Sequence, residues 1–181
     1  MRGLKKIALL ICDIQTKTIK NLYYKDAVIN NINLLLNSKD HIDNFTLGIS
    51  SLLYPEKLGN TSELLNLDKI DIIHSKKTYS ILDDNMREIL EKNKIKEVIL
   101  TGMETQWCIN QSVRDLVKEK YIVNVPVDAV GNNRIDNKIP FKRIEYNGGK
   151  LCLSEDIICE NLVNFDDKGS KWFLNYLKTK K

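Results

Sequence analysis

The stretch "KEVILTGMETQWCINQSVRDL", residues 96–116, changes its hydrophobic pattern halfway along. Its first half is a continuous apolar run, which is typical of a β-strand covered on both faces. Its second half carries Ile109, Val113 and Leu116 at i, i+4 and i+7, on one face of a helix. Gly102 lies between the halves and permits a sharp turn. The stretch therefore predicts a strand, a turn and a crossover helix.

The rest of the chain repeats this alternation. Further strands are predicted over residues 6–13, 43–50, 70–75, 121–129 and 149–154. Between the first two, Leu22, Ile29, Ile32 and Leu36 share one helical face. Together these patterns predict an α/β fold with a doubly wound, six-stranded parallel sheet flanked by helices on both faces. A length of 181 residues suits a single domain over residues 1–181.

Composition narrows the classes of function. Hydrophobic residues make up 43% and charged residues 29%, a balance that argues against disorder. The net charge is only +4 and the lysines lie among acidic neighbours, so we expect no nucleic-acid partner. The apolar run near the N-terminus reaches Asp13 and is too short for a signal peptide or a membrane span. We therefore expect a cytoplasmic protein without a membrane partner.

Cysteine usage agrees with that compartment. Without an export signal, the four cysteines are expected to be reduced thiols. They are Cys12, Cys108, Cys152 and Cys159. None forms a CxxC pair, so a zinc ribbon or a thioredoxin-type motif is disfavoured.

Ligands of such sheets bind beyond the carboxyl ends of the strands. Asp13 ends the first strand, where it either caps a helix or carries a buried charge that requires a cation or donor beside it. Cys12 should alternate to the opposite face and belong to the core. Lys76 and Lys77 follow another strand. Either they are solvated, or one of them stays charged beside a carboxylate and lowers the pKa of a nearby thiol.

Cys108 lies where the predicted helix begins. Helix N-terminal N–H groups favour a thiolate there and could hold an oxyanion. A free cysteine is also often a buried apolar filler. Position alone leaves both interpretations open.

These three positions together resemble the isochorismatase-like superfamily of cysteine hydrolases. The resemblance rests on Asp13 in "ALLICDIQ", the lysine in "SKKTYSIL" and Cys108 in "VILTGMETQWCINQSVRDLVKEKYIVNVPVDAV", and it covers almost the whole chain. The sequences "YPEKLGNTSEL", "GMETQWCI" and "LSED" are most similar to the short isochorismatase-domain-containing proteins. In that family the lysine stands four residues before a serine that follows an aromatic residue. Ser80 follows Tyr79 here, so the match selects Lys76 over Lys77.

The resemblance implies a catalytic triad of Asp13, Lys76 and Cys108. It implies an oxyanion hole formed by the backbone N–H groups of Glu104 and Cys108, and a cis peptide bond between Met103 and Glu104. The expected reaction is hydrolysis of an amide- or imide-type C–N bond of a small molecule through a Cys thioester, without a cofactor. Family members commonly self-associate, so a homo-oligomer is also expected.

Five residues are expected to line the substrate pocket. They are Gln15, Thr18, Tyr54, Tyr79 and Trp107. Family members often carry Phe where this chain has Thr18, which changes the expected pocket wall. Trp107 suits either a pocket or a subunit interface.

Two alternatives stay open beside the amide hydrolase. Nicotinamidases of the superfamily bind a metal through an Asp and two His, whereas this chain has only His41, expected in a surface loop, and His74, expected in a strand. We therefore expect no metal and favour a nicotinamidase-like amidase less. The second alternative is a catalytically silent interaction module of the same fold. A nucleotide-binding domain is excluded because "CDIQTK" lacks the glycine-rich turn.

Overall fold

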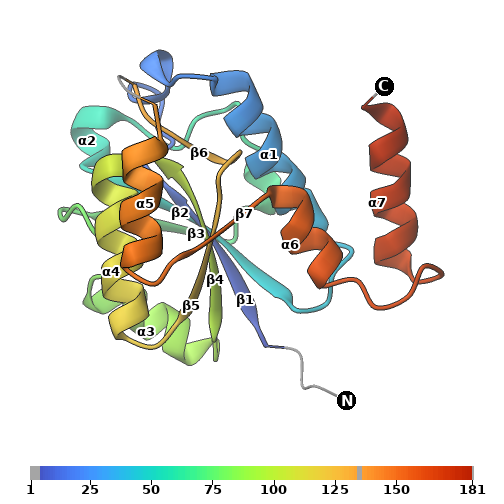
Figure 1. The fold of residues 1–181 in the computed structure, drawn as a ribbon. Helices are drawn as coiled ribbons and strands as arrows, with labels where there is room; N and C mark the ends of the chain where they lie inside the picture. Colours follow the sequence, from blue (N-terminus) through green and yellow to red (C-terminus); the bar gives the residue numbers. More distant parts are fainter. Residues whose placement is uncertain (1–4, 134–135, 181) are drawn as a thin grey trace.

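The computed structural model describes residues 5–133 and 136–180 and contains a seven-stranded parallel sheet. The strand order is β3-β2-β1-β4-β5-β7, and β6 pairs with β4. The strands are β1 Ile7–Cys12, β2 Phe45–Leu53, β3 Ile72–Lys76, β4 Glu97–Met103, β5 Ile122–Pro126, β6 Val130–Gly131 and β7 Lys150–Cys152. The predicted doubly wound α/β fold is confirmed (Figure 1).

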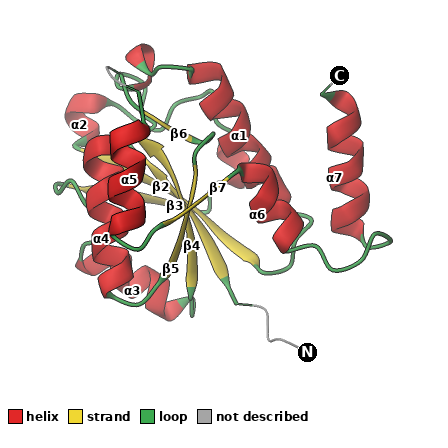
Figure 2. Ribbon diagram, viewed as in Figure 1, coloured by secondary structure: helices red, strands yellow, loops and turns green. Residues whose placement is uncertain are grey.

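The helices cover both faces of the sheet, as the ribbon coloured by secondary structure shows (Figure 2). One face carries α1 (Lys25–Ser38) and α6 (Ser154–Glu160), and α7 (Lys168–Thr179) packs beyond them. The other carries α3 (Asp84–Lys92), α4 (Asn110–Lys118) and α5 (Lys138–Tyr146). Among the described residues, none of these helices has the length and apolar character needed to cross a bilayer.

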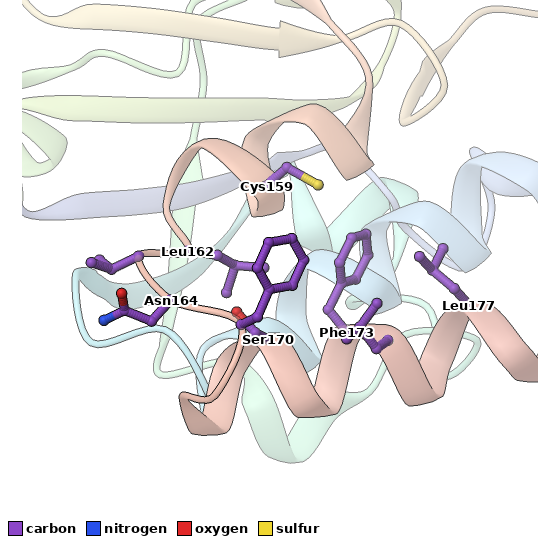
Figure 3. Close-up of a pocket in the computed structure, with 9 residues that line it drawn as sticks. Cys159, Leu162, Asn164, Ser170, Phe173 and Leu177 are labelled. Atoms are coloured by element: carbon purple, nitrogen blue, oxygen red, sulfur yellow. The ribbon is translucent and has the colours of Figure 1, made fainter.

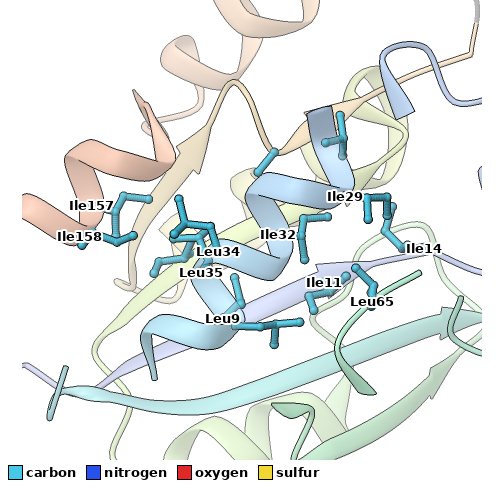
Figure 4. Close-up of a cluster of buried hydrophobic side chains, with 14 of the residues drawn as sticks. Leu9, Ile11, Ile14, Ile29, Ile32, Leu34, Leu35, Leu65, Ile157 and Ile158 are labelled. Carbon is cyan, nitrogen blue, oxygen red and sulfur yellow. The ribbon is translucent and has the colours of Figure 1, made fainter. Parts of the chain in front are cut away.

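The central strand β1 divides the hydrophobic core into two layers. Ile7, Leu9 and Ile11 pack toward α1, whereas Ala8, Leu10 and Cys12 pack toward α3, α4 and α5. This is the side-chain alternation of a β-strand with both faces covered. Figure 4 shows the first layer, in which Leu9 and Ile11 face side chains of α1, and Ile157 and Ile158 of α6 complete the cluster.

Two predictions about the strands need correction. The run predicted as one strand over residues 121–129 ends at Pro126, because a turn follows in which Ala129 N–H donates to the Pro126 carbonyl. The chain then returns to the sheet as the separate strand β6. In addition, the connection from β2 to β3 holds only α2 (Pro55–Leu58) and the 3₁₀ turn Leu67–Lys69, not a full crossover helix. The edge strand β3 therefore leaves Ile73 56% exposed.

The C-terminal helix α7 packs through aromatic side chains. Trp172 stacks on His41 with ring centroids 4.7 Å apart, and Phe173 is buried. Between α6 and α7 lies a pocket of about 280 Å³, in which Cys159 faces the side of α7 that carries Phe173 and Leu177 (Figure 3). This pocket belongs to the outer layer of the fold.

Gly102 allows β4 to pass close to β1 just before the candidate site. Its φ is +105°, a region that other residues rarely adopt. A Cβ atom there would lie 2.1 Å from the Cys12 carbonyl oxygen and 2.7 Å from the Cys12 backbone nitrogen. Both atoms are backbone and cannot move without shifting β1, so only glycine fits.

We expect Gly102→Ala to lower the free energy of unfolding by more than the roughly 1–2 kcal/mol of an unfavourable φ alone, because the added methyl also overpacks the β1 backbone. Gly148→Ala is the matched control, since Gly148 also has a positive φ but its Cβ would meet only side-chain atoms of Val117. Denaturant unfolding of both variants measures the difference. Equal losses of unfolding free energy in the two variants would contradict the proposed clash with the Cys12 backbone.

Candidate active site

Lys76 is a buried cation at the carboxyl end of β3. It is the last residue of that strand and only 1% exposed. Its Nζ donates to Asp13 Oδ2 at 2.9 Å and contacts Cys108 Sγ at 3.9 Å. The carbonyls of Thr78 and Tyr79 accept from the same Nζ at 3.1 and 3.3 Å. Lys77 is exposed, so the lysine that reaches the aspartate is the one selected from the sequence.

The charge of Lys76 is maintained by its acidic neighbours. Burial disfavours the ammonium form, but electrostatic interaction with Cys12, Asp13 and Cys108 and the hydrogen bond to Asp13 outweigh it and raise the pKa of Lys76 above its ordinary value. The lysine is therefore protonated at neutral pH. A buried positive charge of this kind favours negative charge on either of the groups it contacts.

Asp13 lies one residue beyond β1 and leaves the strand conformation. Its φ is +55°, and its N–H still donates to the Ser51 carbonyl of β2 at 2.9 Å. Thr18 Oγ1 donates to the Asp13 carbonyl at 2.7 Å and accepts from Gln15 N–H at 3.1 Å, which holds the turn. Asp13 Oδ1 is buried and has no hydrogen-bond partner among residues 5–133 and 136–180. One carboxylate oxygen is thus held by Lys76 while the other is available to accept a proton.

Cys108 lies in a π-helical turn, Thr105–Ile109, that leads directly into α4. The Met103–Glu104 peptide bond before this turn is cis, at the position that the family resemblance implied. Cys108 is only 4% exposed. Its sulfur, the Cys12 sulfur and an Asp13 carboxylate oxygen all lie within 4.8 Å of one another. The three residues predicted as a triad are therefore together in space, whereas their catalytic role stays a prediction.

Ser112 supports the Cys108 turn and was not identified from the sequence. Its Oγ donates to the Cys108 carbonyl at 2.6 Å and accepts from Ile81 N–H at 2.8 Å. The serine therefore ties the segment after β3 to the turn that carries the cysteine. The available signal was its i+4 spacing from Cys108, the spacing at which a helical serine bonds back to a carbonyl.

Cys12 lies in the site, which corrects the expectation that it points away from Asp13. Alternation would separate neighbouring side chains only if both residues were in the strand. Because Asp13 adopts a positive φ, its carboxylate returns toward Cys12, whose Sγ donates to Asp13 Oδ2 at 3.4 Å. A hydrogen bond with Cys108, then burial and the charge of Asp13, raise the pKa of Cys12 well above its ordinary value. Cys12 is therefore a buried protonated thiol beside the predicted nucleophile.

Cys12, Asp13 and Cys108 also form the group of metal-capable side chains found among the described residues. The Lys76 ammonium already contacts two of the three, and a second cation there would face its charge directly. His74 lies in β3 between Ser51 and Asp83, and His41 stacks on Trp172. Both histidines are thus engaged away from this group.

Gln15 and Thr18, predicted to line the pocket, both make structural hydrogen bonds. Gln15 is fully buried, and its amide donates to the carbonyls of Leu53 and Gly59 and accepts from Leu53 N–H. Thr18 holds the Asp13 turn as described above. These contacts join the ends of β1 and β2, and substrate contact by either residue stays a prediction.

The aromatic residues predicted for the pocket lie close in the chain to the site or bond Lys76 through their backbone. Trp107 is 49% exposed and Tyr79 is 57% exposed, and the backbone carbonyl of Tyr79 accepts from Lys76. Tyr54 is half-buried beside α2, where its N–H donates to the Lys76 carbonyl at 3.2 Å and Lys57 lies over its ring. Whether any of the three contacts a substrate stays a prediction.

Glu104 organises the loop beside the Cys108 turn. Its carboxylate accepts from Gln106 Nε2 and from Asn133 N–H, each at 3.2 Å. The Glu104 side chain therefore joins the Cys108 turn to the segment that follows β6. The oxyanion hole predicted at the N–H groups of Glu104 and Cys108 stays a prediction.

Comparison with known proteins agrees with this geometry. The model of the isochorismatase domain matches residues 60–156. Isochorismatase family protein 1B of Dictyostelium discoideum is 31% identical over 87% of this chain and 82% of its own length. Isochorismatase domain-containing protein 2 of Bos taurus is 28% identical over 83% of this chain and 72% of its own length.

A solved structure shares the fold over nearly its whole length. MAR1 ribonuclease from Caenorhabditis elegans superposes with a TM-score of 0.85 at 27% identity, covering 95% of this chain and 89% of that one. The matched domain includes Lys76 and Cys108, and the relatives extend the match across most of the chain. The family inferred from the three sequence motifs is therefore confirmed, and the chain belongs to the isochorismatase family.

Proposed function

We propose that this protein is a hydrolase that cleaves an amide- or imide-type C–N bond of a small molecule through a thioester on Cys108. The observation that carries the proposal is the buried Lys76 ammonium, which lies 2.9 Å from Asp13 Oδ2 and 3.9 Å from Cys108 Sγ. It stabilises negative charge on either group, so a proton can move between them without leaving an uncompensated charge.

The first half of the reaction forms the acyl-enzyme. Asp13 accepts the Cys108 proton on its unpartnered oxygen, and the thiolate attacks the substrate carbonyl. The backbone N–H groups of Glu104 and Cys108 hold the oxyanion of the tetrahedral intermediate. Asp13 then gives the proton to the departing nitrogen, which breaks the C–N bond and leaves the acyl group on sulfur.

The second half regenerates the thiol. Asp13 takes a proton from water, and the resulting hydroxide attacks the thioester carbonyl. When the C–S bond breaks, Asp13 returns the proton to sulfur and the carboxylic acid product departs. Lys76 keeps its proton throughout, because its neighbours raise its pKa.

The enclosure of the site favours a small substrate. Asp13 and Cys108 are each 4% exposed, so only a compact carbonyl group reaches the sulfur. The similar structure from Caenorhabditis elegans is named a ribonuclease, which makes an RNA phosphodiester a candidate to test. Enclosure and the scattered lysines both favour the small amide over a polyanion.

The same features argue against a silent interaction module. A buried ion pair contributes little net stability compared with apolar residues of similar volume, because both charges lose their hydration. A carboxylate, an ammonium and two thiols gathered at strand ends are instead typical of a reactive site.

Screening identifies the substrate class. Purified protein is incubated with a panel of amides, imides, nicotinamide and a short RNA, and the acyl-enzyme is trapped by acid quench and detected by mass spectrometry. An acyl adduct on Cys108 supports the proposal. Cleavage of RNA without an adduct would favour the ribonuclease alternative.

We expect Cys108→Ser and Asp13→Asn each to reduce turnover by about 10²–10⁴-fold, because the first removes the thiolate and the second removes the proton acceptor. The double variant should be scarcely worse than either single variant, since the residues act as one unit. Cys159→Ser, at an exposed cysteine outside the site, is the control that keeps turnover. Wild-type turnover by Cys108→Ser would disprove the nucleophile assignment.

The two neighbouring lysines allow a second test. Lys76→Met leaves the buried Asp13 without its cation, so the free energy of unfolding should fall by roughly 3–5 kcal/mol and turnover should be lost. Lys77→Met, at an exposed position, should change stability by no more than about 0.5 kcal/mol. Melting curves and turnover of both variants provide the measurement. Larger losses of stability and turnover in Lys77→Met than in Lys76→Met would show that Lys77 is the partner of Asp13.

Thiol reactivity distinguishes an activated cysteine from a filler. We expect iodoacetamide near neutral pH to modify Cys108 first, because Lys76 contacts its sulfur while burial raises the pKa of Cys152 to about 12 and also raises the pKa of Cys159. Both of those thiols stay protonated until the pH rises toward their pKa values, so their labelling should increase with pH. Peptide mapping over time gives the four rates. Slower labelling of Cys108 than of exposed Cys159 would favour the silent module.

A further inference from the structure

Cys12 is a second thiol in the candidate active site that the proposed hydrolysis does not use. It is the last residue of β1, fully buried, and packs in the same layer of the core as Cys108. The two sulfur atoms lie within 4.8 Å of each other. The reaction described above needs one sulfur and one carboxylate, so the position of the second sulfur requires another explanation.

The two thiols are not equivalent. The Lys76 ammonium contacts Cys108 Sγ, whereas Cys12 Sγ is directed at the Asp13 carboxylate, to which it donates. The hydrogen bond with Cys108, burial and the Asp13 charge all hold the pKa of Cys12 well above its ordinary value. Cys108 is therefore the sulfur placed to attack, and Cys12 keeps its proton.

The other two cysteines lie elsewhere. Cys152 packs against the layer of the core that contains α1, and Cys159 lines the pocket between α6 and α7. A disulfide requires the two sulfur atoms to approach to about 2.0 Å, a small movement for side chains that already share one enclosed site. Among the four cysteines, Cys12 is thus the one within reach of Cys108.

We propose that Cys12 and Cys108 form a peroxide-sensitive pair, in which a hydroperoxide oxidises Cys108 and Cys12 then closes a reversible disulfide. The thiolate of Cys108 attacks the peroxide, forming an S–O bond and breaking the O–O bond. Hydroxide leaves and is protonated, which gives a sulfenic acid. Cys12 passes its proton to the Asp13 carboxylate, to which it donates, as its sulfur attacks this sulfenic acid. The S–S bond forms, the S–O bond breaks, and the leaving hydroxide takes that proton to become water. Overall, two thiols lose two electrons and hydrogen peroxide is reduced to two waters.

The pair has two consequences. Oxidation blocks thioester formation, a consequence that rests on the proposed function, and reduction restores it. The disulfide also protects Cys108, because a sulfenic acid without a neighbouring thiol proceeds to the irreversible sulfinic and sulfonic acids.

The test treats the full chain with a small excess of hydrogen peroxide near neutral pH and maps peptides without reduction. We expect a linked peptide pair joining Cys12 to Cys108, and recovery of Cys108 labelling by iodoacetamide after dithiothreitol. In Cys12→Ala, Cys108 should convert to sulfinic and sulfonic acids and dithiothreitol should not recover it. Cys159→Ser is the matched control and should behave as the wild type.

Three results would overturn the pair: an unmodified Cys108 after peroxide, a link from Cys108 to Cys152 or Cys159, or the same dithiothreitol recovery in Cys12→Ala as in the wild type. The wild-type map does not depend on whether Cys12→Ala folds. The peptide map also does not depend on turnover. A Cys12–Cys108 disulfide in a protein that cleaves no amide would therefore refute only the proposed hydrolase function. An acyl adduct on Cys108 without the link would refute the pair alone.

Discussion

The buried ion pair between Lys76 and Asp13 is the constraint on which the site depends. Lys76 ends β3 and Asp13 directly follows β1, and these two strands are separated in the sheet by β2. The Lys76 side chain must therefore reach across the carboxyl end of β2. Hydrogen bonds hold the backbone at that end of β2 in place. The Gln15 side chain bonds the backbone of Leu53, and Tyr54 N–H donates to the Lys76 carbonyl. Polar contacts around the strand ends thus locate two charges that could not otherwise be buried.

The site contains one cation and three groups that can carry negative charge. A single ammonium can compensate one anion in a low-dielectric interior, so a second anion is disfavoured while the first is present. In the proposed mechanism, one negative charge passes from Asp13 to Cys108 as the proton moves the other way, so the ammonium always has one anionic partner. The hydrogen bond with Cys108, burial and the charge of Asp13 raise the pKa of Cys12, whose thiol also donates to Asp13 Oδ2.

The sequence predicted the positions at the strand ends because parallel strands bring their carboxyl ends to one edge. Asp13 and Cys108 could be nominated from local pattern alone, whereas the choice between Lys76 and Lys77 required the family motif. The place of Cys12 could not be predicted, because it depends on the φ of Asp13, which no hydrophobic pattern encodes. Strand β6 was missed because it has only two residues, Val130 and Gly131, and because the apolar residues on both sides of Pro126 were assigned to one strand. Gln15 bonds Leu53 and Gly59, and Ser112 bonds Ile81, through contacts distant in sequence that periodicity does not detect.

The left-handed backbone at Asp13 limits which amino acids position 13 accepts. Asparagine and aspartate tolerate this conformation because their short polar side chains bond locally, whereas longer and branched residues are strained in it. Glutamate would keep the negative charge but would meet a backbone penalty and carry its carboxylate one methylene further from the lysine. Position 13 therefore requires a residue that tolerates a positive φ and that also places a negative charge beside Lys76. Replacement of aspartate by glutamate, which has little effect at many surface sites, would therefore lower the stability of the fold at position 13 whether or not the site is catalytic.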